Sequence, residues 1–108
     1  MEQNNPHEIT VKELAELKKQ HVDFQLIDVR EPSEYDVCHI GGKLIPLAQL
    51  PDRLSELNPE QLTVVHCKSG GRSSRAVEFL LRQGFVNVRN LKGGITAWRS
   101  EIDPTLPV

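Results

Sequence analysis

Short apolar runs alternate with amphipathic segments along the whole chain. The run Leu62-Thr63-Val64-Val65-His66 is nearly all apolar and β-branched, which is typical of a strand covered on both faces. Further strands are expected at residues 8–10 (a short strand or turn), 24–29, 43–46 and 86–89. Apolar residues at helical spacing predict helices over residues 11–17, 47–57, 74–83 and 95–100, and a single helical turn over 32–35.

Capping residues and prolines set the expected limits of these helices. Thr10 is placed to cap the first helix, and Gly84 is placed to end the third. Pro51 falls within the second helix, so a break or a restarted helix is expected there. The tail over residues 102–108 contains two prolines and is expected to be extended and partly loose.

The order of these elements predicts an α/β fold. Repeated βα units favour a mostly parallel sheet of five strands, flanked by helices on both faces. A chain of 108 residues has no room for two independent cores, so residues 1–108 are expected to form one domain. In sheets of this kind ligands bind outside the carboxyl ends of the strands.

Composition narrows the class of protein further. The apolar fraction of 38% and the charged fraction of 26% are ordinary for a globular domain. A net charge of −2 indicates neither a nucleic-acid-binding protein nor a membrane-surface protein. No apolar stretch approaches the roughly 20 residues of a membrane helix. The N-terminus is polar and shows no secretory signal.

The chain contains two cysteines, Cys38 and Cys67, and no CxxC pair. Its four histidines show no metal-ligand spacing, so no metal site is expected. A domain with this many aliphatic residues needs no disulfide, and we expect both thiols to be free in a cytoplasmic, reducing compartment.

Cys67 is the candidate nucleophile. It follows a predicted strand and precedes a Gly-rich turn and a helix start, and backbone N–H groups from Lys68 to Arg72 can converge on its sulfur. Gly70 and Gly71 permit the positive φ that such a turn requires. The cations Lys68 and Arg72 add to this effect, so the thiol pKa is expected to fall from about 8.5 to roughly 3.5–7.5. The alternative is an inert cysteine after a core strand.

Several neighbouring residues have two interpretations. Ser69 and Ser73 can hydrogen-bond a bound anion, and Ser73 is also a candidate helix cap. His66 precedes the nucleophile, but adjacent side chains of a strand point to opposite faces, which favours a hydrogen-bonded structural histidine. Trp98 and Phe79 or Phe85 are expected to be core residues.

Three segments of the chain resemble the rhodanese family of sulfurtransferases. The run Cys67 to Ser73 resembles the family's active loop, in which a cysteine begins a six-residue loop that often ends in arginine. The N-terminal signature of the family is matched by Asp28-Val29-Arg30-Glu31 with Glu34-Tyr35 and His39-Ile40, and its C-terminal signature by Leu91-Lys92-Gly93-Gly94-Ile95-Thr96-Ala97-Trp98. The resemblance covers about residues 8–101, which leaves 102–108 as a C-terminal tail.

The resemblance implies a rhodanese-like fold and a sulfur-transfer mechanism. Cys67 would take the sulfane sulfur of thiosulfate or of a protein persulfide and pass it, as a Cys67 persulfide, to a thiophilic acceptor. Substrate would be bound by the loop residues Lys68, Ser69, Gly70, Gly71, Arg72 and Ser73, without any cofactor. The resemblance also suggests that Asp28 is structural and that Arg30 faces the site, although a surface salt bridge of Arg30 with Glu31 or Glu34 is an equally good interpretation.

Within the family, the spacing and the tail are similar to rhodanese domains fused behind MoeB/ThiF-type adenylyltransferases. Those fusions give sulfur to small carrier proteins of molybdopterin, thiamine or tRNA-thiolation pathways. The implied partners are a small anionic sulfur donor, a sulfur carrier protein or cysteine desulfurase, and a fused adenylyltransferase domain, with no nucleic acid or membrane. The sequence leaves open whether the domain is free-standing.

Some features keep alternatives open. Cys38 stands where the family usually has glycine, and it is either a resolving thiol for the Cys67 persulfide or a small, partly buried side chain. Residues 41–44 also depart from the family pattern, so the loop there is expected to differ in shape. One rival function is a phosphatase, but its relatives have five residues between cysteine and arginine where this chain has four. The second rival is a non-catalytic docking module, which commonly lacks the cysteine.

Overall fold

A computed structural model describes residues 5–107 of the chain. The polar N-terminal residues 1–4 and the last residue of the tail, Val108, lie outside the described residues.

The expected α/β fold is confirmed. Five strands form one sheet in the order β1-β5-β4-β2-β3, and every neighbouring pair is parallel. The strands are β1 (Glu8–Ile9), β2 (Gln25–Asp28), β3 (Lys43–Leu44), β4 (Thr63–His66) and β5 (Val88–Leu91). β4 is central, and its residues Thr63 to His66 are all buried, as its apolar sequence predicts.

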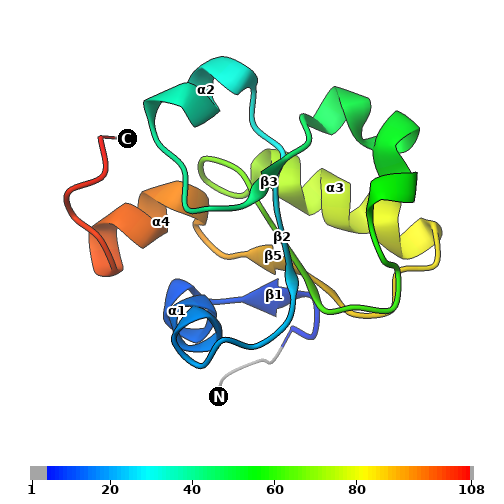
Figure 1. The fold of residues 1–108 in the computed structure, drawn as a ribbon, viewed down its shortest axis with the longest axis horizontal. Coiled ribbons are helices and arrows are strands. Elements are labelled where there is room, and N and C mark those ends of the chain that lie inside the picture. Colours follow the sequence, from blue (N-terminus) through cyan, green and yellow to red (C-terminus); the bar gives the residue numbers. More distant parts are fainter. Residues whose placement is uncertain (1–4, 108) are drawn as a thin grey trace.

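Helices cover both faces of the sheet, also as expected (Figure 1). They are α1 (Val11–Lys19), α2 (Pro32–Val37), the 3₁₀ segment η1 (Leu47–Glu56), α3 (Gly71–Arg82) and α4 (Gly94–Glu101). α1 packs against α4, and α3 packs against η1, β4 and β5. α1 and α4 therefore cover one face of the sheet, and α3 and η1 cover the other. α2 lies at the end of the sheet where β2 and β4 finish (Figure 1).

The alternation of side chains along β4 divides the core into two layers. Val64 belongs to the layer under α1 and α4, while Val65 belongs to the layer under α3 and η1. The first layer consists of Ile9, Val11, Leu14, Ile40, Val64, Leu91, Ile95 and Trp98. The second consists of Ile27, Val29, Ile45, Leu50, Leu57, Val65, Cys67, Ala76, Val77, Leu80, Phe85 and Val88.

The predicted helix signals are present in the structure. Thr10 caps α1 through a capping box, in which its hydroxyl accepts a hydrogen bond from the Glu13 amide at 3.1 Å. The expected break in the second helix occurs at Arg53, two residues after Pro51, where φ is −119° and ψ is 15°. Gly84 follows the end of α3 with φ of +93°.

Several boundaries differ from the sequence prediction by one to three residues, and those of α3 and β5 bear on the site. α3 begins at Gly71, three residues before the predicted start at Ser74, because Gly70 rather than a serine side chain opens the helix. β5 lies two residues later than predicted, and Val86, which the apolar pattern placed inside the strand, is 69% exposed.

The prediction of a loose tail is wrong for its described residues. After α4 the chain turns, and Ile102 and Leu106 pack against the core layer under α1 and α4. Arg99 Nε donates a hydrogen bond to the Leu106 carbonyl at 2.8 Å, which fixes the segment along the helix. In Figure 1 the tail (red) runs back from the end of α4 in the direction of α2.

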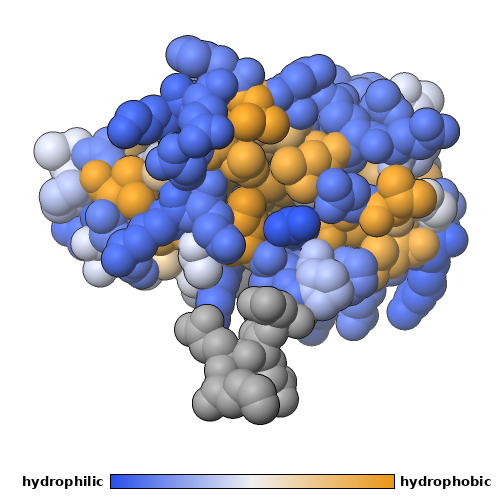
Figure 2. Space-filling view, turned by 90° about the horizontal axis from the view of Figure 1, so that it is seen from below, coloured by the Kyte–Doolittle hydropathy of each residue, from blue (hydrophilic) through white to orange (hydrophobic). Residues whose placement is uncertain are grey.

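No helix among residues 5–107 is long and apolar enough to cross a membrane. Viewed from below, the surface is largely hydrophilic, with hydrophobic residues in several patches between the hydrophilic ones (Figure 2). Patches of this kind are normal on a globular protein.

Candidate active site

Cys67 lies directly after β4, the central strand, in the loop Cys67–Arg72 (the Cys67 loop). Its side chain is buried, with 1% of the residue exposed. The sulfur accepts hydrogen bonds from the Gly70 amide at 3.1 Å and from the Ser73 amide at 3.5 Å. The Ser73 amide belongs to the first turn of α3, so the positive end of the helix dipole also faces the sulfur.

The turn depends on Gly70. Its φ of +119° is in the left-handed region, which glycine adopts without strain, and this conformation aims its N–H back at the sulfur. Gly71 is not among the described glycines with positive φ, and a Cβ there would meet nothing within 4 Å. Only one of the two predicted glycines is therefore needed for the turn.

The outward side of the loop backbone is held by the N-terminus of α4. The amides of Ile95 and Thr96 donate to the carbonyls of Cys67 and Lys68, each at 3.0 Å. A Cβ at Gly94 would lie 2.6 Å from the Cys67 oxygen and 2.5 Å from the Lys68 oxygen, so only glycine fits. Fixing the carbonyls outward leaves the loop amides free to face the sulfur. In the sequence, the only sign of this contact between α4 and the Cys67 loop was the Gly93-Gly94 pair of the C-terminal family signature.

Hydrogen bonds to the sulfur affect the pKa of Cys67. Burial raises the pKa of the Cys67 thiol, while hydrogen bonds from the Ser73 hydroxyl and amide lower this pKa. The amides of Gly70 and Ser69 act in the same direction, and the pKa of Cys67 lies below its ordinary value. This agrees in direction with the predicted activation of the thiol, but the leading causes are amides and a hydroxyl rather than the neighbouring cations.

The two predicted cations of the loop have different surroundings. Lys68 is exposed. The two terminal nitrogens of Arg72 donate to the carboxylate of Glu34 on α2 at 2.7 and 3.0 Å, so binding of an anion by Arg72 stays a prediction. That contact raises the pKa of Arg72 and lowers the pKa of Glu34 to about 2. The ion pair joins the start of α3 to α2.

The interpretation of Ser73 as a helix cap is wrong. Gly70 occupies the cap position of α3, and Ser73 lies in the first turn of the helix, fully buried. The Ser73 hydroxyl lies 3.4 Å from the Cys67 sulfur and 2.5 Å from Oδ1 of Asn90 on β5. Asn90 was not identified from the sequence, where it is one polar residue before Leu91. Ser69, the second predicted serine, is exposed.

Asp28 is the last residue of the neighbouring strand β2, and Arg30 lies two residues after it. Arg30 is 3% exposed, and its Nε and Nη2 donate to the two Asp28 carboxylate oxygens at 3.0 and 2.8 Å. The surface salt bridge with Glu31 or Glu34 that the sequence allowed is therefore replaced by a buried pair with Asp28. Nη2 also donates to the Cys38 carbonyl at 2.8 Å, which ties the end of α2 to the site.

His66 is fully buried, and its contacts are weak. Its Nδ1 lies 3.4 Å from the Cys67 carbonyl, and its Nε2, which has no hydrogen-bond partner, is 3.7 Å from Asp28 Oδ2. Burial lowers the pKa of His66, so the ring is neutral. The histidine fits the predicted structural role in its burial, although its hydrogen bonding is poorer than expected.

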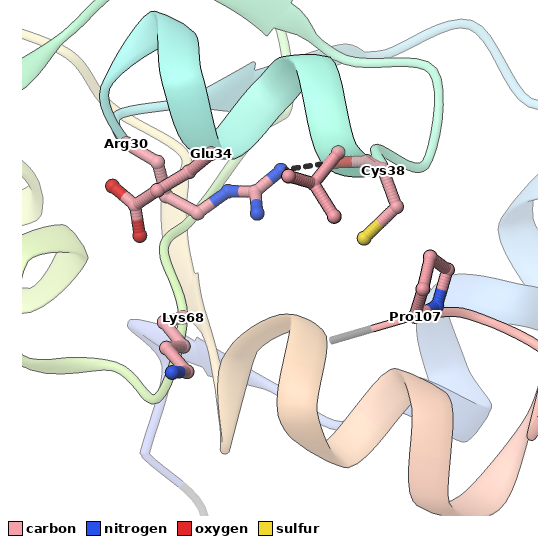
Figure 3. A pocket seen from close by; sticks show the side chains of 6 residues that line it. Arg30, Glu34, Cys38, Lys68 and Pro107 are labelled. Atoms are coloured by element: carbon pink, nitrogen blue, oxygen red, sulfur yellow. Dashed lines mark hydrogen bonds between the residues drawn. The ribbon is translucent and has the colours of Figure 1, made fainter.

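A pocket of about 150 Å³ opens beside the Cys67 loop, between α2, the loop and the tail (Figure 3). We call it the α2 pocket, and it is lined by Arg30, Glu34, Val37, Cys38, Lys68 and Pro107. Arg30 and Lys68 contribute positive charge to it and Glu34 contributes negative charge, whereas Val37 and Pro107 are apolar. Figure 3 shows the Arg30 guanidinium and the Cys38 sulfur directed into this space. Cys38 is a free, half-buried thiol, as in the simpler of its two interpretations.

The geometry favours chemistry at a buried sulfur anion. Amide donors and a helix N-terminus stabilise negative charge on Cys67, and only four residues separate Cys67 from Arg72. Among residues 5–107 no group of three His, Cys, Asp or Glu side chains is arranged to hold a metal ion.

Comparison with protein families and known proteins agrees with the motifs. The model of the rhodanese-like domain matches residues 10–101. A rhodanese-like/PpiC domain-containing protein 12 of Arabidopsis thaliana is 47% identical over 90 residues, which are 79% of this chain and 30% of that protein. The probable adenylyltransferase/sulfurtransferase MoeZ of Mycobacterium tuberculosis is 37% identical over 101 residues, 91% of this chain and 26% of MoeZ. This chain therefore spans less than a third of either relative.

Relatives of similar length also exist. A sulfurtransferase of Allochromatium vinosum is 37% identical over 93 residues, which cover 85% of this chain and 87% of that protein. Among solved structures, a rhodanese-related protein of Thermoplasma volcanium superposes with a TM-score of 0.80 at 33% identity, covering 89% of this chain and 93% of that one. The fold is therefore shared with the Thermoplasma volcanium protein, and the sequence is similar to both proteins over most of its length.

Proposed function

Because this chain belongs to the rhodanese-like domain family, we propose that it is a sulfurtransferase that carries sulfane sulfur as a persulfide on Cys67. Sulfur transfer is supported at the level of the family by relatives named as sulfurtransferases. The residues that perform it, the persulfide and the donor are our proposal.

One observation carries the proposal, namely the hydrogen bonding of the Cys67 sulfur. The amides of Gly70 and Ser73 lie at 3.1 and 3.5 Å from it, in a loop whose carbonyls are fixed outward by α4. Such preformed donors stabilise an anionic sulfur both before and after a second sulfur is attached. A loop with four residues between Cys67 and Arg72 suits a persulfide better than a bulkier phosphate.

The reaction divides into two balanced displacements. The Cys67 thiolate attacks the sulfane sulfur of thiosulfate, a new S–S bond forms to Cys67, and the old S–S bond breaks to release sulfite. The persulfide retains one negative charge, and the loop amides stabilise it. A thiophilic acceptor such as cyanide then attacks the outer sulfur and leaves the thiolate of Cys67 ready for another turnover. Neither step requires a metal or an organic cofactor.

The α2 pocket supports an anionic donor. Arg30 and Lys68 line it, and Arg30 is held rigidly by Asp28. We propose that these two cations attract the sulfonate of thiosulfate, so that Arg30 has a binding role besides its structural one. Ser69 and Gly71, which are exposed, belong to the proposed binding surface through the loop backbone.

Partners are proposed from the relatives. MoeZ is named as an adenylyltransferase and sulfurtransferase, so this domain is proposed to work with an adenylyltransferase, fused or separate, and with a sulfur carrier protein or cysteine desulfurase. Molybdopterin, thiamine and tRNA-thiolation carriers fit that proposal. Free thiols at Cys38 and Cys67 suit a reducing compartment such as the cytoplasm.

Intact-mass measurement tests the proposal. Incubation with thiosulfate is expected to add the mass of one sulfur atom, cyanide is expected to remove it, and Cys67→Ser is expected to show neither change. Cys38→Ser is the matched control, because it removes the second thiol and is expected to gain sulfur like the wild type. A wild-type protein that gains no sulfur from thiosulfate or from a protein persulfide would contradict the proposal.

Two rival functions predict different results. A phosphatase needs its loop arginine for phosphate, but here Arg72 is bound to Glu34, and hydrolysis of a phenyl phosphate at a rate equal to sulfur transfer would favour this rival. A docking module would bind its partner without any persulfide on Cys67.

A further inference from the structure

The Ser73 hydroxyl lies near more acceptors than it can serve. Its oxygen is 2.5 Å from Asn90 Oδ1, 3.3 Å from the Gly70 carbonyl and 3.4 Å from the Cys67 sulfur. A serine hydroxyl has one proton and can donate it to only one of these groups at a time. The shortest of the three contacts is with Asn90, so the proton lies on the side of Asn90 while Cys67 is a neutral thiol.

The orientation of the Asn90 amide follows from its second contact. Its Nδ2 lies 3.3 Å from the Gly70 carbonyl, which can only accept a hydrogen bond. Nδ2 therefore donates to Gly70, and Oδ1 must be the atom that faces Ser73. Because Oδ1 can only accept, the short contact requires the hydroxyl of Ser73 to be its donor.

From this geometry we propose that Asn90 is a positioning residue, which competes with the Cys67 sulfur for the single proton of the Ser73 hydroxyl. While Asn90 holds the proton, a lone pair of the Ser73 oxygen faces Cys67, and this arrangement suits a neutral thiol that donates its S–H. When Cys67 ionises, the hydroxyl has to turn from Asn90 to the sulfur to stabilise the thiolate. Asn90 thus restrains the ionisation of the nucleophile.

The Gly70 carbonyl does not depend on Asn90. It also accepts a hydrogen bond from the Ser74 amide at 3.0 Å within α3, so the loop keeps this backbone anchor if the asparagine side chain is removed. A released Ser73 proton would then have the Gly70 carbonyl or the sulfur as acceptors at similar distances. An anionic sulfur is the stronger acceptor of the two.

The elements that pack around the Cys67 loop carry several charged and titratable groups, and a substitution at Asn90 changes none of them. They are Lys68 and Arg72 of the loop and α3, Glu34 of α2, Asp28 and His66 at the ends of β2 and β4, Arg30 just after β2, Arg89 on β5 and Lys92 directly after β5.

The test is the pKa of Cys67, measured from the ultraviolet absorbance of its thiolate in a Cys38→Ser background. Asn90→Ala is expected to lower this pKa by roughly half to one unit, the effect of about one hydrogen bond. In a Ser73→Ala background the same substitution is expected to change nothing, because no proton is left to compete for. Asn87→Ala, at an exposed asparagine just before β5, is the matched control and is expected to leave the pKa unchanged.

An unchanged or raised pKa of Cys67 in Asn90→Ala would overturn the proposal. So would a shift of the same size when Asn90→Ala is made in the Ser73→Ala background, and Asn90 would then be only a structural support. Asn90→Asp gives a second test that preserves side-chain size, and its charged acceptor is expected to raise the pKa, so a lowered value would also overturn the proposal. These measurements read ionisation and not sulfur transfer. A failure of persulfide formation would therefore contradict the proposed function alone.

Discussion

Asp28 and Arg30 form a buried ion pair beside the strand that carries Cys67. Asp28 is fully buried, Arg30 is 3% exposed, and two guanidinium nitrogens meet the two carboxylate oxygens. The Arg30 amide donates to the same carboxylate at 3.0 Å. Such a pair is costly to break from one side, because the remaining charge stays buried without a partner.

Replacing Asp28 is therefore expected to destabilise the fold more than the loss of a surface contact. We expect Asp28→Asn to lower the free energy of unfolding by about 3 kcal/mol or more, since a neutral amide cannot balance the buried guanidinium. Urea unfolding followed by circular dichroism measures this change.

Glu56→Gln is the matched control for that experiment. Glu56 contacts Arg53 at 2.8 Å and Lys43 at 2.9 Å on the exposed surface, where ion pairs contribute little to stability. Its urea midpoint is expected to equal that of the wild type. Equal effects of the Asp28 and Glu56 substitutions would contradict a structural role for the buried pair.

The elements of the fold were predictable because each one follows a simple periodic pattern. β4 is nearly all apolar, and Thr10, Pro51 and Gly84 mark helix limits that the structure confirms or shifts by two residues. The start of α3 was not predictable, because a glycine in the left-handed region opens the helix where a serine cap was expected three residues later.

That error at α3 also hid part of the site. Ser73 was predicted to bind an anion or to cap the helix, and nothing in the sequence connected it with Asn90. Their contact requires the parallel register of β4 with β5, which places Val65 beside Asn90, and a helix that begins at Gly71. Cys67 itself was identified because a cysteine, glycines and an arginine are adjacent in the chain.

The pair of Glu34 with Arg72 joins two elements, and its contribution to stability depends on pH. The hydrogen bond from Arg72 lowers the pKa of Glu34 to about 2 from an ordinary value of 4.5. A lowered carboxyl pKa contributes stability that is fully present above the ordinary pKa and is lost as the pH falls toward the folded value.

We therefore expect the difference in free energy of unfolding between wild type and Glu34→Gln to be constant near neutral pH. It should shrink as the pH falls from about 4.5 to about 2. Urea unfolding at a series of pH values measures it, and the low pKa of Glu56 cancels because both proteins contain that residue. A difference that stays constant over the whole range would show that the ion pair does not act through the charge of Glu34.

At the scale of the whole molecule, the site lies where distant parts of the chain meet. β2 and β4 bring Asp28 level with His66, α4 fixes the loop backbone, and α2 and the tail close the pocket. The family signatures fall in these separate segments because each supplies one wall of the same site. The tail supplies Pro107, which lines the α2 pocket opposite Lys68 (Figure 3).

Shortening the chain to end at Leu106 is expected to open the α2 pocket from this side. Arg99 can still hold the Leu106 carbonyl, and Leu106 keeps its packing against the core, so the fold should be retained. Cys38 lines the pocket with Pro107, and its alkylation by iodoacetamide is expected to become several-fold faster, as measured by peptide mass analysis. Cys67 does not line the pocket and is the internal reference, while Pro104→Ala, at an exposed proline of the same tail, should leave both rates unchanged. An unaltered rate at Cys38 in the shortened chain would mean that the tail does not limit access to the pocket.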